Sequence, residues 1–128
     1  MKTIEMKLRG NPVRLLCNNA AIFEMQDTLG KDLNAALNER GKKGVENLFT
    51  AALIMAEQGE AYRAYLGKER GKVIPREFLE VVLSPYEVLE LKEKVFEAIN
   101  AGYEREIEEE EKEIDLGLLE LKKKEGKS

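Results

Sequence analysis

Residues 2–18, KTIEMKLRGNPVRLLCN, decide how the chain begins to fold. Apolar and polar residues alternate on both sides of Gly10-Asn11, and this alternation is typical of half-buried strands. Glycine beside asparagine is a two-residue turn signal, so the stretch predicts a β-hairpin whose apolar residues pair on one face. With Gly10-Asn11 as the turn, the predicted pairs are Leu8 with Val13, Met6 with Leu15 and Ile4 with Cys17.

After the hairpin the apolar spacing changes to a helical period. The predicted helices are 20–29, 32–40, 45–66, 75–83 and a long last helix that begins at Ser84. Residues 49–56, FTAALIMA, are apolar nearly all round and indicate the central buried helix. The glycine-punctuated stretches GKKG at 41–44 and GKERGKVIP at 67–75 predict loops. The expected fold class is α+β, mostly α, with an N-terminal β-hairpin followed by about four to five helices.

The central helix is expected to turn one side inward. The residues assigned to that side are Val45, Leu48, Phe49, Ala52, Met55 or Ala56, and Tyr62.

The last helix carries the clearest local signal in the chain. Residues 84–87, SPYE, place serine at the N-cap, proline at the first helical position and glutamate at the third, which is a capping box. The apolar residues that follow cover a stripe about 180° wide, although packing on one core needs only about 100°. Either the whole stripe is core, or part of it contacts another protein chain. In the second interpretation Val88, Leu91, Val95 and Ile99 pack inward, and Leu89, Phe96 and Tyr103 are left for a partner.

Length and charge restrict the domain plan and the partners. At 128 residues the chain has the size of one domain, which we assign to residues 1–103. Residues 104–113, EREIEEEEKE, hold seven Glu against one Arg and one Lys, so 104–128 is predicted to be a charged, flexible tail. The net charge is −4 and this stretch alone contributes −5, so the rest of the chain is nearly neutral. It therefore offers no basic surface for nucleic acid. No apolar run reaches membrane-spanning length, so we expect a cytoplasmic protein that does not enter the membrane.

The residue inventory disfavours enzymes. The chain has no histidine, which removes Ser-His-Asp triads, Cys-His pairs and histidine-bearing metal sites. A mechanism with two carboxylates stays formally open, but most Glu residues follow solvent-facing helical patterns. Cys17 would lie on the apolar face of the hairpin as a small buried side chain. We therefore expect no catalytic residue, metal or cofactor, and a protein that acts by binding other proteins.

The order of segments resembles a known family. The hairpin KTIEMKLRGNPVRL is followed by NNAAIFEMQDTLGKDL and then by the apolar helix GVENLFTAALIMA. This order is similar to that of the tail assembly chaperones of long-tailed bacteriophages and prophages, and the resemblance extends to about residue 103. It implies a protein without an active site that binds the tape measure protein, keeps it soluble and helps tail tube protein subunits assemble around it. It also implies that the protein works in the bacterial host cytoplasm and is not retained in the mature virion.

Two other functions remain open from the sequence. If Leu89, Phe96 and Tyr103 contact another chain, we expect this protein to self-associate. A virion structural or connector protein would share that self-association, the small size and the acidity. A small acidic regulatory protein would use the acidic stretch to bind a basic partner.

Overall fold

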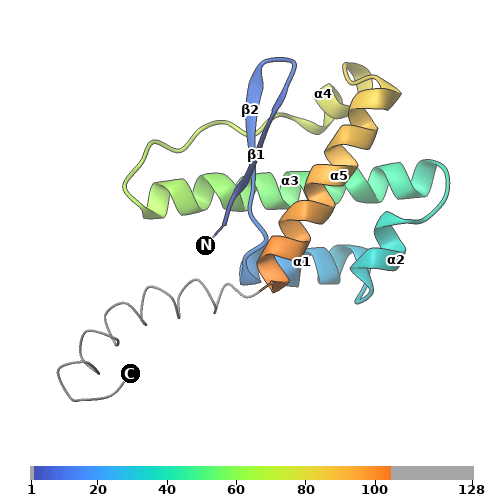
Figure 1. Cartoon of the computed structure of the whole chain (residues 1–128), viewed down its shortest axis with the longest axis horizontal. Coiled ribbons are helices and arrows are strands. Elements are labelled where there is room, and N and C mark those ends of the chain that lie inside the picture. The colour runs from blue at the N-terminus through green and yellow to red at the C-terminus, as the bar shows by residue number, and fades with distance from the viewer. Residues whose placement is uncertain (1, 105–128) are drawn as a thin grey trace, which may run out of the picture.

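The computed structural model describes residues 2–104 and has the predicted α+β, mostly α fold, a two-stranded hairpin followed by five helices (Figure 1). The elements are β1 (Ile4–Leu8), β2 (Asn11–Leu15), α1 (Asn19–Leu29), α2 (Leu33–Leu37), α3 (Lys42–Tyr65), α4 (Arg76–Val81) and α5 (Pro85–Tyr103). The predicted tail beyond Glu104 lies outside the described residues. No helix in residues 2–104 is both long enough and apolar enough to cross a membrane.

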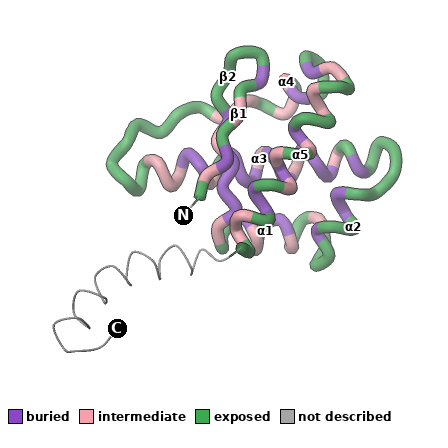
Figure 2. Tube along the Cα trace, in the orientation of Figure 1, coloured by how far each residue is buried: buried purple, intermediate pink, exposed green. Residues whose placement is uncertain are grey.

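Helix α3 is the centre of the fold, as the apolar stretch 49–56 predicted. It contacts β2 and every other helix, and in Figure 1 α5 crosses in front of it while α1 and α2 lie along one side. β1 packs on α5 and β2 packs on α3. Buried residues concentrate where the hairpin, α3 and α5 meet (Figure 2). The fully buried large side chains there include Leu15, Met55, Leu91 and Val95.

The hairpin forms with a register different from the predicted one. Its turn is Arg9-Gly10, with φ angles of 51° and 80°, and Leu8 faces Asn11. Positive φ at both central residues is the geometry of a type I′ turn. The shift is two residues, so the apolar residues keep the predicted face, but the pairs are Ile4 with Leu15 and Met6 with Val13.

Proline explains the shift. In the predicted register Pro12 would have to close the turn by donating a backbone N–H to Arg9, and proline has none. In the observed register Pro12 faces Lys7 in a pair that exchanges no backbone hydrogen bonds. Cys17 then lies beyond β2 rather than opposite Ile4, and it is buried as predicted.

β2 and α3 approach closely at one point. The backbone N–H of Leu16 donates to the carbonyl oxygen of Met55 at 3.1 Å. One turn further along α3, a Cβ on Gly59 would overlap the carbonyl oxygen of Arg14. Gly59 therefore allows the strand backbone to lie directly against the helix.

Several helix ends differ from the predicted ones. The side-chain oxygen of Asn18 caps α1 by accepting a hydrogen bond from the N–H of Ala21. Helices α2 and α4 are shorter than the predicted 32–40 and 75–83. α2 stops at Asn38, whose side-chain amide donates to the carbonyl oxygen of Asn34.

The stretch 41–44 is not the predicted loop, because Lys42–Gly44 forms the first turn of α3. Gly44 is buried there, and a Cβ on it would overlap the carbonyl oxygen of Glu39. Gly44 thus takes the inward position, and Val45, which was expected to be inward, is 39% exposed.

Candidate protein-binding surface

The N-terminus of α5 is fixed by its capping box and by the hairpin turn. The hydroxyl of Ser84 accepts from the N–H of Glu87 at 3.2 Å, and the carboxylate of Glu87 accepts from the N–H of Ser84 at 3.0 Å, so the predicted capping box is present. Arg9 donates to the same carboxylate through Nη2 at 2.7 Å and Nε at 2.9 Å. The Arg9 hydrogen bonds, followed by the one from Ser84, lower the pKa of Glu87 to about 2.

The inner side of α5 packs into the core, as both interpretations of its apolar stripe required. Leu91, Val95 and Ile99 are buried and Val88 is partly buried. At the far end a Cβ on Gly102 would overlap the carbonyl oxygen of Cys17, so the helix also touches the chain that leaves β2. Both ends of α5 are therefore held against the hairpin segment.

The outer side of α5 carries the three residues predicted to face a partner, and we call Leu89, Phe96 and Tyr103 the α5 column. Leu89 is 62% exposed and Tyr103 is 61% exposed. Phe96 is half-buried and packs against the core, so it is shared between the core and the surface rather than left wholly for another chain. It occupies the border of the stripe, next to the buried Val95.

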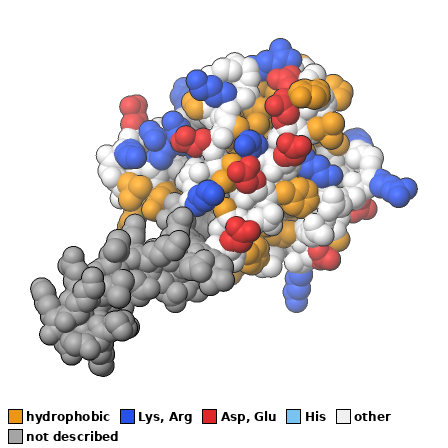
Figure 3. Space-filling model, in the orientation of Figure 1, with side chains coloured by type: hydrophobic (Ala, Val, Ile, Leu, Met, Phe, Trp, Pro, Cys, Tyr) orange, Lys and Arg blue, Asp and Glu red, His pale blue; other side chains and the backbone are white. Residues whose placement is uncertain are grey.

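The column repeats at heptad spacing. Residues seven apart drift by only about 20° around a helix, so Leu89 and Tyr103 lie on the same side, about 21 Å apart along the axis. Glu93 and Asn100 are exposed between the apolar residues. In Figure 3, whose view has α5 in front, hydrophobic side chains form small patches separated by charged ones. The surface is thus a row of separate apolar anchors with a polar surround.

Sequence reasoning missed two neighbours of the column. Tyr86 is 72% exposed and precedes Leu89 by three residues, a spacing that could have identified it. At the other end, Tyr103 and Ile99 line an open hollow of about 440 Å³. The wall is completed by Lys31 and Asp32, which precede α2, and by Leu33 and Asn34 in its first turn. Their closeness to Tyr103 depends on the tertiary fold, and no sequence signal marks it.

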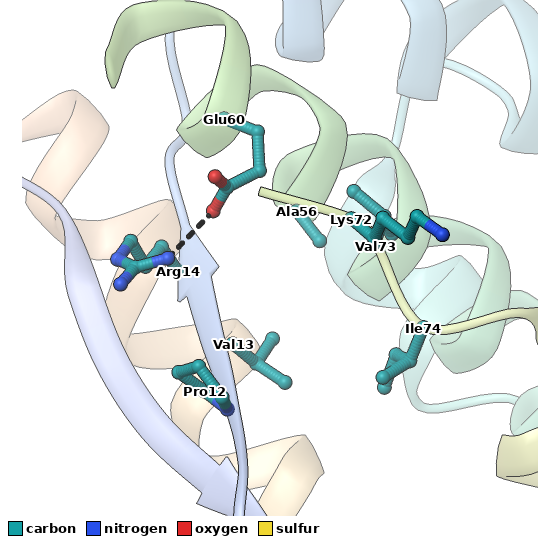
Figure 4. A pocket seen from close by; sticks show the side chains of 8 residues that line it. All are labelled: Pro12, Val13, Arg14, Ala56, Glu60, Lys72, Val73 and Ile74. Atoms are coloured by element: carbon teal, nitrogen blue, oxygen red, sulfur yellow. Dashed lines mark hydrogen bonds and ion pairs between the residues drawn. The ribbon is translucent and has the colours of Figure 1, made fainter. Parts of the chain in front are cut away.

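A second cluster surrounds Glu60, which is only 4% exposed although most Glu residues were expected to face solvent (Figure 4). Its carboxylate accepts from Nη1 of Arg14 at 3.0 Å and from the N–H of Gly71 at 2.6 Å. These bonds tie β2 and the 67–75 loop to α3. Residues 67–75 form the predicted loop, and Val73 and Ile74 pack its second half against the core.

The cavity beside Glu60 has a volume of about 10 Å³, which is room for about one water. Both carboxylate oxygens already accept hydrogen bonds from the protein, so we assign this cluster a structural role.

Within residues 2–104 no group of three or more acidic or cysteine side chains is placed to hold a metal ion. The α5 column, whose exposed apolar residues repeat along one side of a single helix, is the surface on which we build a functional proposal. When the chain is compared with known proteins, no family model, curated protein or solved structure matches it.

Proposed function

We propose that this chain is a non-catalytic tail assembly chaperone whose α5 column binds an apolar helical segment of the tape measure protein. The observation that carries the proposal is the exposure of Leu89 and Tyr103 on the same side of one helix, which contacts the hairpin segment at both ends. Phe96 lies midway between them and contributes a partly exposed ring.

The heptad spacing of the column supports a helical partner. Two helices that pack side by side remain in contact when their apolar residues repeat about every seven positions. A long helical chain can present such a repeat along its length, and a column of about 21 Å matches roughly four turns of it. Because anchors are separated by Glu93 and Asn100, the contact has polar gaps that keep the free protein dispersed.

The energetics suit reversible coating. Fully burying an exposed leucine or aromatic side chain contributes about 1.5–3 kcal/mol, and binding also costs entropy. A few partly exposed anchors therefore give weak binding to each segment. Several copies on one long chain would keep it soluble and would be displaced when tail tube subunits assemble around it. In this proposal the protein works in the host cytoplasm and is absent from the finished particle.

The test is co-expression of a phage tape measure protein with the wild type and with the Leu89→Glu/Tyr103→Glu variant. The matched control is Tyr65→Glu, since Tyr65 is 86% exposed on α3, outside the column. We expect the wild type and the control to keep the tape measure protein in the soluble fraction, and the column variant to lose that ability.

Thermal unfolding of the three proteins shows whether the column variant is folded. A folded column variant that still solubilises the tape measure protein would place the binding surface elsewhere. Recovery of the wild-type chain in purified, complete particles would favour a virion component instead.

A further inference from the structure

The outer edge of β1 has backbone groups without partners among residues 2–104. Because Leu8 and Asn11 close a two-residue turn, the even-numbered residues of β1 direct their N–H and C=O groups toward β2. Those of Glu5 and Lys7 point away from β2, and no backbone hydrogen bond from another described element reaches them. Both residues are exposed. In Figure 1 the hairpin extends beyond α3 on the side opposite α1 and α2.

The outer edge of β2, by contrast, is closed. Pro12 has no N–H to offer, and the N–H of Leu16 is bonded to Met55 of α3. The carbonyl oxygen of Arg14 lies against Gly59. The hairpin can therefore be extended only from β1, and an open strand edge is a template for another strand.

Charge selects the occupant of this edge. For two antiparallel β1 strands, the outward backbone groups require that odd-numbered residues face odd-numbered residues. One such register places Glu5 opposite Glu5 of the second copy, and another places Lys7 opposite Lys7. Both are disfavoured, because like charges directly opposite each other are destabilising. The register between these two sets Glu5 opposite Lys7 of the second copy, twice over. β1 is thus complementary to itself in one register.

We propose that two copies of this chain pair through β1, in antiparallel orientation about a two-fold axis, to form a four-stranded sheet. The axis passes between the two Met6 residues, and each Glu5–Lys7 pair exchanges two backbone hydrogen bonds. Glu5 already lies 3.4 Å from Nε of Arg14 on β2, so each new pair extends a row of alternating charge. Lys7, which faces Pro12 within its own hairpin and makes no ion pair in the described chain, gains an acidic neighbour.

The experiment uses the full chain and charge reversal. Sedimentation velocity at micromolar concentration is recorded for the wild type, for Glu5→Lys, for Lys7→Glu and for an equimolar mixture of the two variants. Each single variant brings like charges together at both pairs, which weakens dimerisation by about tenfold or more. In the mixture, positions 5 and 7 are both basic in one variant and both acidic in the other. A heterodimer therefore joins opposite charges at both pairs, and pairing is restored.

Leu89→Glu is the control for association through the α5 column, and it stays dimeric. We expect a dimeric wild type, monomeric single variants and a dimeric mixture, with slow amide hydrogen exchange at Glu5 and Lys7 in the wild type. Rescue in the mixture also shows that both variants are folded. A monomeric wild type, single variants that remain dimeric, or a mixture that stays monomeric would each overturn the proposal. Because the proposed chaperone surface lies on α5, failure here would leave that function untouched.

Discussion

Replacing Gly59 by alanine is a sharp test, because helix propensity and the packing in this structure predict opposite effects on stability. By propensity alone the change should stabilise α3 by about 1 kcal/mol. In the fold, the new Cβ would overlap the carbonyl oxygen of Arg14. The helix backbone fixes the position of this Cβ and the oxygen belongs to the strand backbone, so neither atom can rotate away. Overpacking of this kind costs about 1–3 kcal/mol, and loss of the nearby hydrogen bond from Leu16 to Met55 adds about 1 kcal/mol. The net expectation is a loss of about 1–3 kcal/mol in the free energy of unfolding.

Urea denaturation followed by circular dichroism measures this change. The control is Ala64→Gly, near the exposed end of the same helix, where only propensity acts and the loss is at most about 1 kcal/mol. Gly59→Ala and Ala64→Gly are opposite substitutions in the same helix, and we expect both to destabilise the protein. If Gly59→Ala has an unchanged or higher unfolding free energy, the close crossing of β2 over α3 is wrong.

Three further changes test the hairpin and the start of α5. Because the pKa of Glu87 is lowered to about 2, its pairing with Arg9 stabilises the fold fully above the ordinary carboxyl pKa of about 4.5, and this contribution is lost as pH falls from there through 2. Glu87→Gln should flatten the pH dependence of the melting temperature in that window. An unchanged pH profile would contradict a stabilising role for the Arg9–Glu87 ion pair. Gly10→Ala should cost about 1–2 kcal/mol, since Gly10 has a φ of 80° with no neighbour that a Cβ would strike; an equal melting temperature would contradict the Arg9-Gly10 turn. Ser84→Ala should cost about 1 kcal/mol through loss of the N-cap, measured by urea denaturation, and no loss would mean that Arg9 alone fixes the helix start.

Local chemistry made much of the fold predictable. Alternation identified both strands, and Ser84, Pro85 and Glu87 marked the start of α5 because capping depends on residues within one turn. The hairpin register was also within reach, since Pro12 cannot donate the hydrogen bond that the predicted turn required. The error was to take Gly10-Asn11 as the turn, because that choice requires Pro12 to donate a backbone hydrogen bond.

Long-range partners decided the rest. Nothing near Glu60 distinguishes it from the exposed Glu57, yet Arg14 and Gly71 bury it from opposite directions. Gly44 likewise became inward only because Glu39 approaches it. In the α5 column, the helical period correctly separated the core side from Leu89 and Tyr103, but how far Phe96 is buried depends on the elements that pack beside it.

The most direct test of the proposed function is to locate the surface that a tape measure segment touches. A recombinant helical segment is titrated into isotopically labelled chain, and side-chain resonances are followed by NMR. The account predicts that the largest shifts occur at Leu89, Phe96 and Tyr103, whereas Tyr65 on α3 and Phe23 on α1, which are 86% and 68% exposed, stay unchanged. Binding that shifts Phe23 or Tyr65 and leaves the α5 column unchanged would contradict it.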